Sequence, residues 1–197
     1  HIAMSVDSYL KELADESKAL KTASLTMLSG LNKEEEGLLR SVWPSISPPR
    51  RHQIIDRLMA LAEDNVELDF TAVFQVGLTD NDGEVRELAI KGLWECEDRS
   101  LIPTLIHLLK NDPVEKVRSA AATALGRFAL LAELGKLLDR DRQRIQDVIL
   151  ETIQNGQESS EVRRRAIEAM APFTSPQTNE IILNAYHSAD MKMKASA

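Results

Sequence analysis

The sequence has a single cysteine, Cys96, and its aromatic residues make up only 4% of 197 residues. One cysteine cannot form an internal disulfide, so we expect a reducing, cytoplasmic location. No apolar run approaches the roughly 20 residues that a membrane-spanning helix needs, and the polar N-terminal region shows no signal-peptide pattern. We therefore expect no membrane partner. Residues 1–3, which precede Met4, are interpreted as a cloning remnant.

The chain also lacks an excess of positive charge, since its formal net charge is −7 and its pI is about 5.2. Proteins that bind nucleic acid usually carry a basic field, so this balance argues against nucleic acid as the main ligand. What is present is 43% hydrophobic and 28% charged residues, with abundant strong helix formers. This composition favours an all-α chain with a sizeable core.

Residues that could support catalysis are sparse. Cys96 could act as a nucleophile only beside a histidine base, yet His52, His107 and His187 fall on three different predicted helices. No H-x-x-x-H or C-x-x-C spacing predicts a metal site. We therefore expect no catalytic residues, no metal ligands and no cofactor, and predict that the protein is not an enzyme.

Apolar residues at helical spacing form a stripe that Ser17 and Ser24 interrupt, and they predict one N-terminal amphipathic helix over residues 1–31, whose docking is left open. Asn32, followed three residues later by Glu35, predicts a capped helix start. Ser47 as a cap and Pro48 at the first helical position predict a helix that runs to about Asp64. Seven further helices are expected at about residues 67–79, 83–96, 100–111, 113–133, 141–155, 160–171 and 176–188. No segment alternates with period two, so no strand is expected.

Three of these helices share one pattern, in the stretches Glu84–Leu93, Lys116–Leu125 and Glu161–Met170. Each contains a charged residue, Val-Arg, an alanine three residues on, and Leu or Met four residues later. The pattern aligns three apolar columns: Val85, Val117 and Val162; Ala89, Ala121 and Ala166; Leu93, Leu125 and Met170. Because positions i, i+4 and i+8 lie on one helical face, each column predicts a buried contact.

The repeating unit is a pair of helices. The valines of the first two copies lie 32 residues apart (85 to 117), and a preceding amphipathic helix repeats at the same offset. The third copy follows after 45 residues (117 to 162), so it carries thirteen extra residues around Arg127–Arg142. A longer helix and loop would explain them, and a protrusion that contacts a partner is the alternative.

These motifs resemble the HEAT family, especially the HEAT-like repeats named after phycobilisome lyases. The signature D-x(5)-R occurs as Asp80 to Arg86 and as Asp112 to Arg118. Arg163 keeps the arginine, but Gln157 occupies the acidic position. The resemblance covers about residues 67–172 and is weaker over 33–64. It implies a right-handed α-α superhelix over residues 32–197, in which the Asp and Arg side chains form a ladder between adjacent repeats.

The resemblance also implies that the second helices line the concave side of the stack. The face opposite the apolar columns is then the predicted partner-binding surface, formed by Glu84, Glu87, Lys91, Glu95, Lys116, Ser119, Thr123, Arg127, Glu161, Arg164 and Glu168. Trp94 is expected either in the packing between repeats or as an exposed aromatic anchor.

At the C-terminus, Met193, Lys194 and Ala197 fall on the Val, Arg and Ala columns. We therefore expect the chain to stop inside another repeat of a longer protein. This leaves open self-association through an uncovered repeat face.

The most direct hypothesis for function is a non-catalytic scaffold that binds a protein partner. Two alternatives follow from related HEAT-like proteins. A bilin lyase-type subunit would shift the absorbance of added bilin, and a HEAT-like DNA glycosylase would shift duplex DNA in a salt-dependent way. The acidic balance and the few aromatic residues disfavour the glycosylase.

Overall fold

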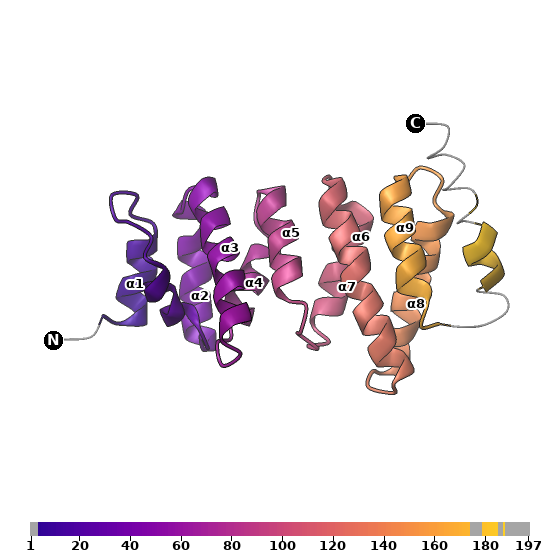
Figure 1. The fold of residues 1–197 in the computed structure, drawn as a ribbon, viewed down its shortest axis with the longest axis horizontal. Helices are drawn as coiled ribbons and strands as arrows, with labels where there is room; N and C mark the ends of the chain where they lie inside the picture. Colours follow the sequence, from indigo (N-terminus) through magenta and orange to yellow (C-terminus); the bar gives the residue numbers. More distant parts are fainter. Residues whose placement is uncertain (1–3, 174–178, 185–186, 188–197) are drawn as a thin grey trace. The chain divides into compact units, whose positions relative to one another are not determined.

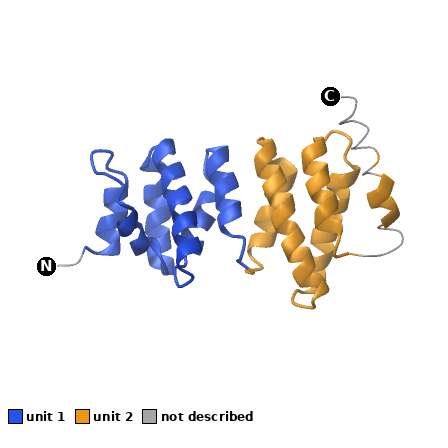
Figure 2. Cartoon of the chain, viewed as in Figure 1, with its two compact units in different colours: residues 1–96 blue, residues 97–197 orange. Residues whose placement is uncertain are grey.

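The computed structural model describes residues 4–173, 179–184 and 187, and in these ranges it is helical without any strand (Figure 1). The predicted all-α class is confirmed: the described chain is an α-helical solenoid of stacked helix pairs. It divides into two compact units, residues 1–96 and residues 97–197 (Figure 2). The N-terminal segment therefore belongs to the same unit as the first helix pairs.

The described residues of unit 1 form five α-helices and two 3-10 helices: α1 (Val6–Leu13), η1 (Thr22–Leu28), α2 (Lys33–Val42), η2 (Trp43–Ser45), α3 (Pro48–Asp64), α4 (Thr71–Gly77) and α5 (Gly83–Gly92). Helix α2 packs on α4 and α3 packs on α5, so the pairs α2–α3 and α4–α5 stack on one another. The predicted capping box at the start of α2 is confirmed. Asn32 Oδ1 accepts from the Glu35 N–H at 2.8 Å, and Glu35 accepts from the Asn32 N–H at 2.9 Å.

The prediction of a single N-terminal helix is wrong, because α1 ends at Leu13 and η1 begins only at Thr22. Asp15 Oδ1 accepts from both the N–H and the hydroxyl of Ser17, at 3.0 and 2.6 Å. These local bonds compete with helical hydrogen bonds and also lower the pKa of Asp15. The segment is nevertheless docked, since two side chains of α3 donate to its carbonyls: Arg50 to Leu13 and Arg57 to Leu20.

Tyr9 on α1 leads to a testable prediction. Its ring is 6% exposed, and its hydroxyl has no hydrogen-bond partner among the described residues. Burial, reinforced by Glu12, raises the pKa of Tyr9 to about 12. Because this folded-state value lies above the unfolded value of about 10, ionisation opposes folding, and stability falls as pH rises through this window.

Tyr9→Phe removes both the unpartnered hydroxyl and its ionisation. We expect an unchanged or higher urea midpoint at neutral pH, because no hydrogen bond is lost. Between about pH 10 and pH 12 the variant should lose less stability than the wild type. Urea titrations followed by circular dichroism at the two ends of this pH window test this. Equal losses in the two proteins would contradict it.

Unit 2 contains α6 (Leu101–Asn111), α7 (Glu115–Glu133), α8 (Asp139–Gln154) and α9 (Ser160–Met170). Helix α7 packs against α6, α8 and α9, and it comes close to α9 at Gly126. A Cβ at Gly126 would lie 3.0 Å from the Cα of Ala169, so glycine permits this close approach.

The nine apolar column residues are all buried, with exposed fractions between 0 and 3%. The predicted inward face of each repeat helix is therefore confirmed. The predicted ends are less accurate, since α5 stops at Gly92 instead of continuing to Cys96. Part of the expected helix at 176–188, together with Met193, Lys194 and Ala197, lies outside the described residues.

Candidate interaction surfaces

The predicted partner-binding residues of unit 1 lie on α5 or just after it. Glu84, Lys91 and Glu95 are exposed, and Glu87 is half-buried. Lys91 Nζ lies 2.8 Å from Glu87 Oε1, and Glu84 lies 3.3 Å from the imidazole of His52. The one cation of this group is therefore already paired on its own helix.

The predicted residues of unit 2 lie on α7 and α9. Lys116, Thr123 and Glu168 are exposed, whereas Ser119, Arg127, Glu161 and Arg164 are half-buried. Ser119 Oγ is enclosed and has no hydrogen-bond partner among the described residues.

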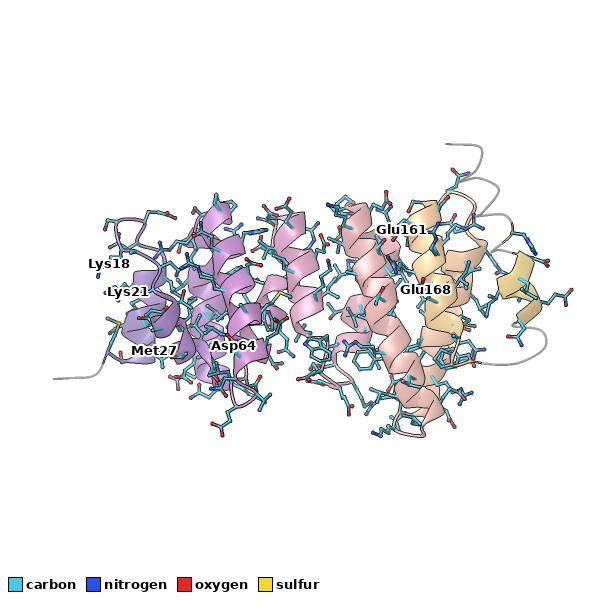
Figure 3. All side chains as sticks on the ribbon, viewed as in Figure 1. Lys18, Lys21, Met27, Asp64, Glu161 and Glu168 are labelled. Atoms are coloured by element: carbon cyan, nitrogen blue, oxygen red, sulfur yellow. The ribbon has the colours of Figure 1, made fainter. Side chains whose placement is uncertain are left out.

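On α9 the two acidic residues of the predicted face, Glu161 and Glu168, are labelled in Figure 3. Both contact Arg165, which lies 3.0 Å from Glu161 and 3.2 Å from Glu168. The hydrogen bond that Arg165 donates to Glu168 and the charge of Glu161 raise the pKa of Arg165. The sequence reading missed Arg165, although its i+4 and i−3 spacings to these acids were visible. The acidic charge of this face is largely neutralised within one helix.

The ladder residue Asp80 is buried in unit 1. Its carboxylate accepts from Trp43 Nε1 at 2.7 Å and from the Asp82 N–H at 2.8 Å. Arg51 of α3 donates to it through Nη2 at 3.1 Å, and Arg51 Nε lies 2.8 Å away as an ion pair without hydrogen-bond alignment. Asp80 therefore connects the α4–α5 pair to the α2–α3 pair. Arg51 and Trp43 were not identified from the sequence.

In unit 2 the ladder runs from Arg118 of α7 to Glu158, just before α9. Arg118 Nε and Nη2 each donate to this carboxylate at 3.0 Å. The acidic partner in the third copy is therefore Glu158. The signature had placed the acidic position one residue earlier, at Gln157. Arg163 instead donates to the Ile153 carbonyl at 3.0 Å, within its own helix pair.

Within a repeat the signature Asp and Arg also contact each other, through the backbone of the Asp. Arg86 donates to the Asp80 carbonyl at 2.8 Å, and Arg118 donates to the Asp112 carbonyl at 2.9 Å. The Asp112 carboxylate accepts from the Val114 N–H at 2.9 Å. Each arginine thus fixes the turn that enters its own helix, which explains the constant spacing of the signature.

The extra residues of the third copy form a hairpin from the end of α7, the turn 134–138 and the start of α8. Figure 1 shows this hairpin at the lower edge of unit 2. Its inner side is anchored by Phe128, which is 1% exposed. Along the hairpin Leu130, Leu134 and Leu138 are 52%, 61% and 49% exposed. We call these three residues the leucine edge.

A groove of about 540 Å³ lies in unit 1 between the end of α3, the start of α4 and the end of α5. Phe70 and Phe74 form its buried floor. Val66 and Trp94 stand at its margin and are 94% and 60% exposed. Of the two positions expected for Trp94, packed between repeats or exposed, the structure shows the exposed one. We call this cavity the Trp94 groove.

The residues considered for catalysis or metal binding are dispersed. Cys96 is half-buried, His52 faces Glu84, and His107 Nδ1 lies 3.2 Å from the Asn111 amide. Among the described residues, no three His, Cys, Asp or Glu side chains gather so that they could hold a metal ion. No helix in the described ranges has the length and apolar character needed to cross a bilayer.

Comparison with known protein families bears on the repeat pattern. Residues 71–154 match the family model of HEAT repeats. This range of HEAT repeats runs from the start of α4 to the end of α8, and it contains both copies of the D-x(5)-R signature. The match supports the predicted HEAT family, while the phycobilisome-lyase type stays a prediction. No curated protein matches the chain.

Proposed function

We propose that this chain is a non-catalytic HEAT-repeat scaffold that binds a protein partner. The observation that supports the proposal is the location of the large apolar side chains that are exposed to solvent. Of the seven large hydrophobic side chains exposed in the described ranges, five lie in two places, the leucine edge and the Trp94 groove. Clustered exposed apolar groups are typical of interaction surfaces, whereas single ones are common on any protein.

The leucine edge is the stronger of the two as a partner contact. Phe128, Ala129 and Ala132 are buried at 0 to 5% exposure, whereas the three leucines are about half exposed and therefore contribute less to the core. Repeat insertions map to loops that often bind. The polar faces of α5, α7 and α9 then contribute specificity, because they carry charges of both signs, some of which form pairs on α5 and α9. The single cysteine is compatible with a scaffold in a reducing, cytoplasmic setting.

An affinity pull-down tests this proposal. The bait pair is the wild-type chain and a variant with Leu130→Ser, Leu134→Ser and Leu138→Ser, both checked for an unchanged circular dichroism spectrum. A matched control changes three exposed polar residues of unit 2, Lys110→Ser, Gln143→Ser and Gln154→Ser. We expect the wild type and the control to recover the same proteins and the leucine variant to lose them. Equal recovery by all three baits would contradict the leucine edge as the partner contact, and a wild-type bait that recovers no protein would contradict the proposal.

A further inference from the structure

We infer that the Trp94 groove binds a peptide segment in which a large apolar side chain is flanked by lysine or arginine. The inference deepens the proposed function, on which it rests, by naming the class of partner segment that unit 1 accepts. It depends on three properties of the groove: an apolar interior, a fixed floor and an acidic margin.

The interior is apolar and large enough for a side chain of another protein. Phe70, Phe74 and Leu93 are 2 to 3% exposed, so they form a packed floor. Met59 and Leu68 are half-buried along the walls. The volume of about 540 Å³ falls within the roughly 300–1,000 Å³ of typical ligand sites. One or two leucine- or phenylalanine-sized side chains can therefore be buried in it.

The floor is held in place by a close contact between α4 and α5. A Cβ added at Gly92 would lie 2.5 Å from Cε1 of Phe74, so the ring packs directly against the helix backbone. Phe74 is also buried on its other sides, at 3% exposure. A groove whose floor does not need to rearrange loses less free energy to ordering when a ligand binds.

The margin of the groove is acidic. Glu63, Asp69 and Glu95 line it, and Asp64 and Glu67 are exposed on the same α3–α4 connection. Its one lining cation, Lys91, lies 2.8 Å from Glu87. Within the described ranges none of these five carboxylates has a cationic partner within ion-pair distance. This contrasts with the paired acids on α9.

Charge complementarity therefore identifies the occupant. Unpaired carboxylates around an apolar groove attract a basic segment and repel an acidic one or a phosphate backbone. An arginine of the bound segment can also stack on the exposed ring of Trp94, while lysine stems cover apolar surface. In a segment with apolar residues at its centre and basic residues on both sides, the apolar residues fill the interior and the basic residues pair with the acidic margin.

Two synthetic peptides test the inference against the full chain. The basic probe is acetyl-KRLFLRK-amide and the acidic counterpart is acetyl-EDLFLDE-amide. Trp94 is exposed and Trp43 is 3% exposed, so binding at the groove should shift the tryptophan emission to shorter wavelength. We expect the basic peptide to bind at least about tenfold more tightly than the acidic one, with the difference shrinking as salt is raised.

Charge-reversed variants test whether the peptide binds at the Trp94 groove. Glu63→Lys with Glu95→Lys should weaken the basic peptide at least about tenfold and improve the acidic one. The matched control, Glu16→Lys with Glu34→Lys, changes the net charge equally at exposed positions of unit 1 outside the groove lining and should leave both affinities within about twofold. Calorimetry with Trp94→Ala should show weakened binding. Equal affinity for the two peptides, or equal effects of the two charge-reversed variants, would overturn the inference.

The outcomes are distinguishable from those of the proposed function. If the basic peptide binds at the groove but the leucine variant still recovers every protein, the leucine-edge contact is wrong and the groove assignment stands. If the pull-down succeeds and no peptide binds, the groove assignment is wrong and the scaffold stands. A concentration-dependent dimer that Trp94→Ala disrupts would mean that a second copy of the chain occupies the groove, and this would also overturn the peptide inference.

Discussion

Asp80→Ala is expected to lower the free energy of unfolding of unit 1 by about 3–5 kcal/mol. The substitution removes one carboxylate and leaves three donors without their acceptor: Arg51, the Trp43 indole N–H and the Asp82 N–H. Arg51 is the costly one, because its side chain is 8% exposed and its charge would stay buried without a carboxylate, with the Ile46 carbonyl as its acceptor. Breaking a buried ion pair from one side costs far more than the pair itself contributes.

Urea unfolding followed by tryptophan fluorescence measures this effect, since Trp43 and Trp94 both lie in unit 1. Asp64→Ala is the matched control: it removes an exposed carboxylate and should change stability by no more than about 0.5 kcal/mol. A loss below about 1 kcal/mol for Asp80→Ala would show that the ladder does not join the two helix pairs.

Phe128→Ala is expected to destabilise unit 2 by a comparable amount, about 3–5 kcal/mol. Phe128 is the largest of the fully buried side chains, and it fixes the part of α7 that continues toward the hairpin. Its removal opens a cavity between packed helices that the surrounding backbone can close only in part.

The control lies two residues away on the same helix. Leu130 is 52% exposed, so Leu130→Ala should stay within about 0.5 kcal/mol of the wild type. Both tryptophans lie outside unit 2, so circular dichroism and hydrogen exchange of α7 and α9 are the suitable probes. Similar effects of the two substitutions would mean that the hairpin is not anchored through Phe128.

The features that were predicted correctly from the sequence are those that depend on the local spacing of apolar residues. Val117, Ala121 and Leu125 recur at helical spacing and are matched in two other helices, so their common burial could be inferred from one chain. The same reasoning gave a wrong prediction for the N-terminal helix. The spacing of apolar residues does not reveal the local hydrogen bonds between Asp15 and Ser17 that end the helix early.

Contacts between distant residues were harder to predict. Arg99 and Asp141 form a pair at 2.8 Å although 42 residues separate them, and neither was singled out. Arg118 reaches Glu158 and not Gln157, the position that the D-x(5)-R spacing gives when it is counted back from Arg163. The Trp94 groove combines residues from three segments. The sequence singled out residues on its α5 side, such as Lys91, Trp94 and Glu95, but did not predict that the end of α3 and the start of α4 complete a groove with them.

The central claim is that the matched repeat helices turn their valine–alanine–leucine columns inward. Native-state labelling of engineered cysteines in a Cys96→Ser background tests it most directly. Three sites replace the fully buried column alanines, each variant being checked for an unchanged circular dichroism spectrum: Ala89→Cys, Ala121→Cys and Ala166→Cys. Three reference sites lie on exposed positions of the same helices: Glu84→Cys, Thr123→Cys and Glu168→Cys.

With a thiol reagent under native conditions, the three reference sites should react at nearly the rate of the unfolded chain. The three column sites should react at least about a thousandfold more slowly, since a buried thiol is reached only through an opening of the structure. Column cysteines that react as fast as their references would contradict the stacking of helix pairs, and with it the ladder and both interaction surfaces.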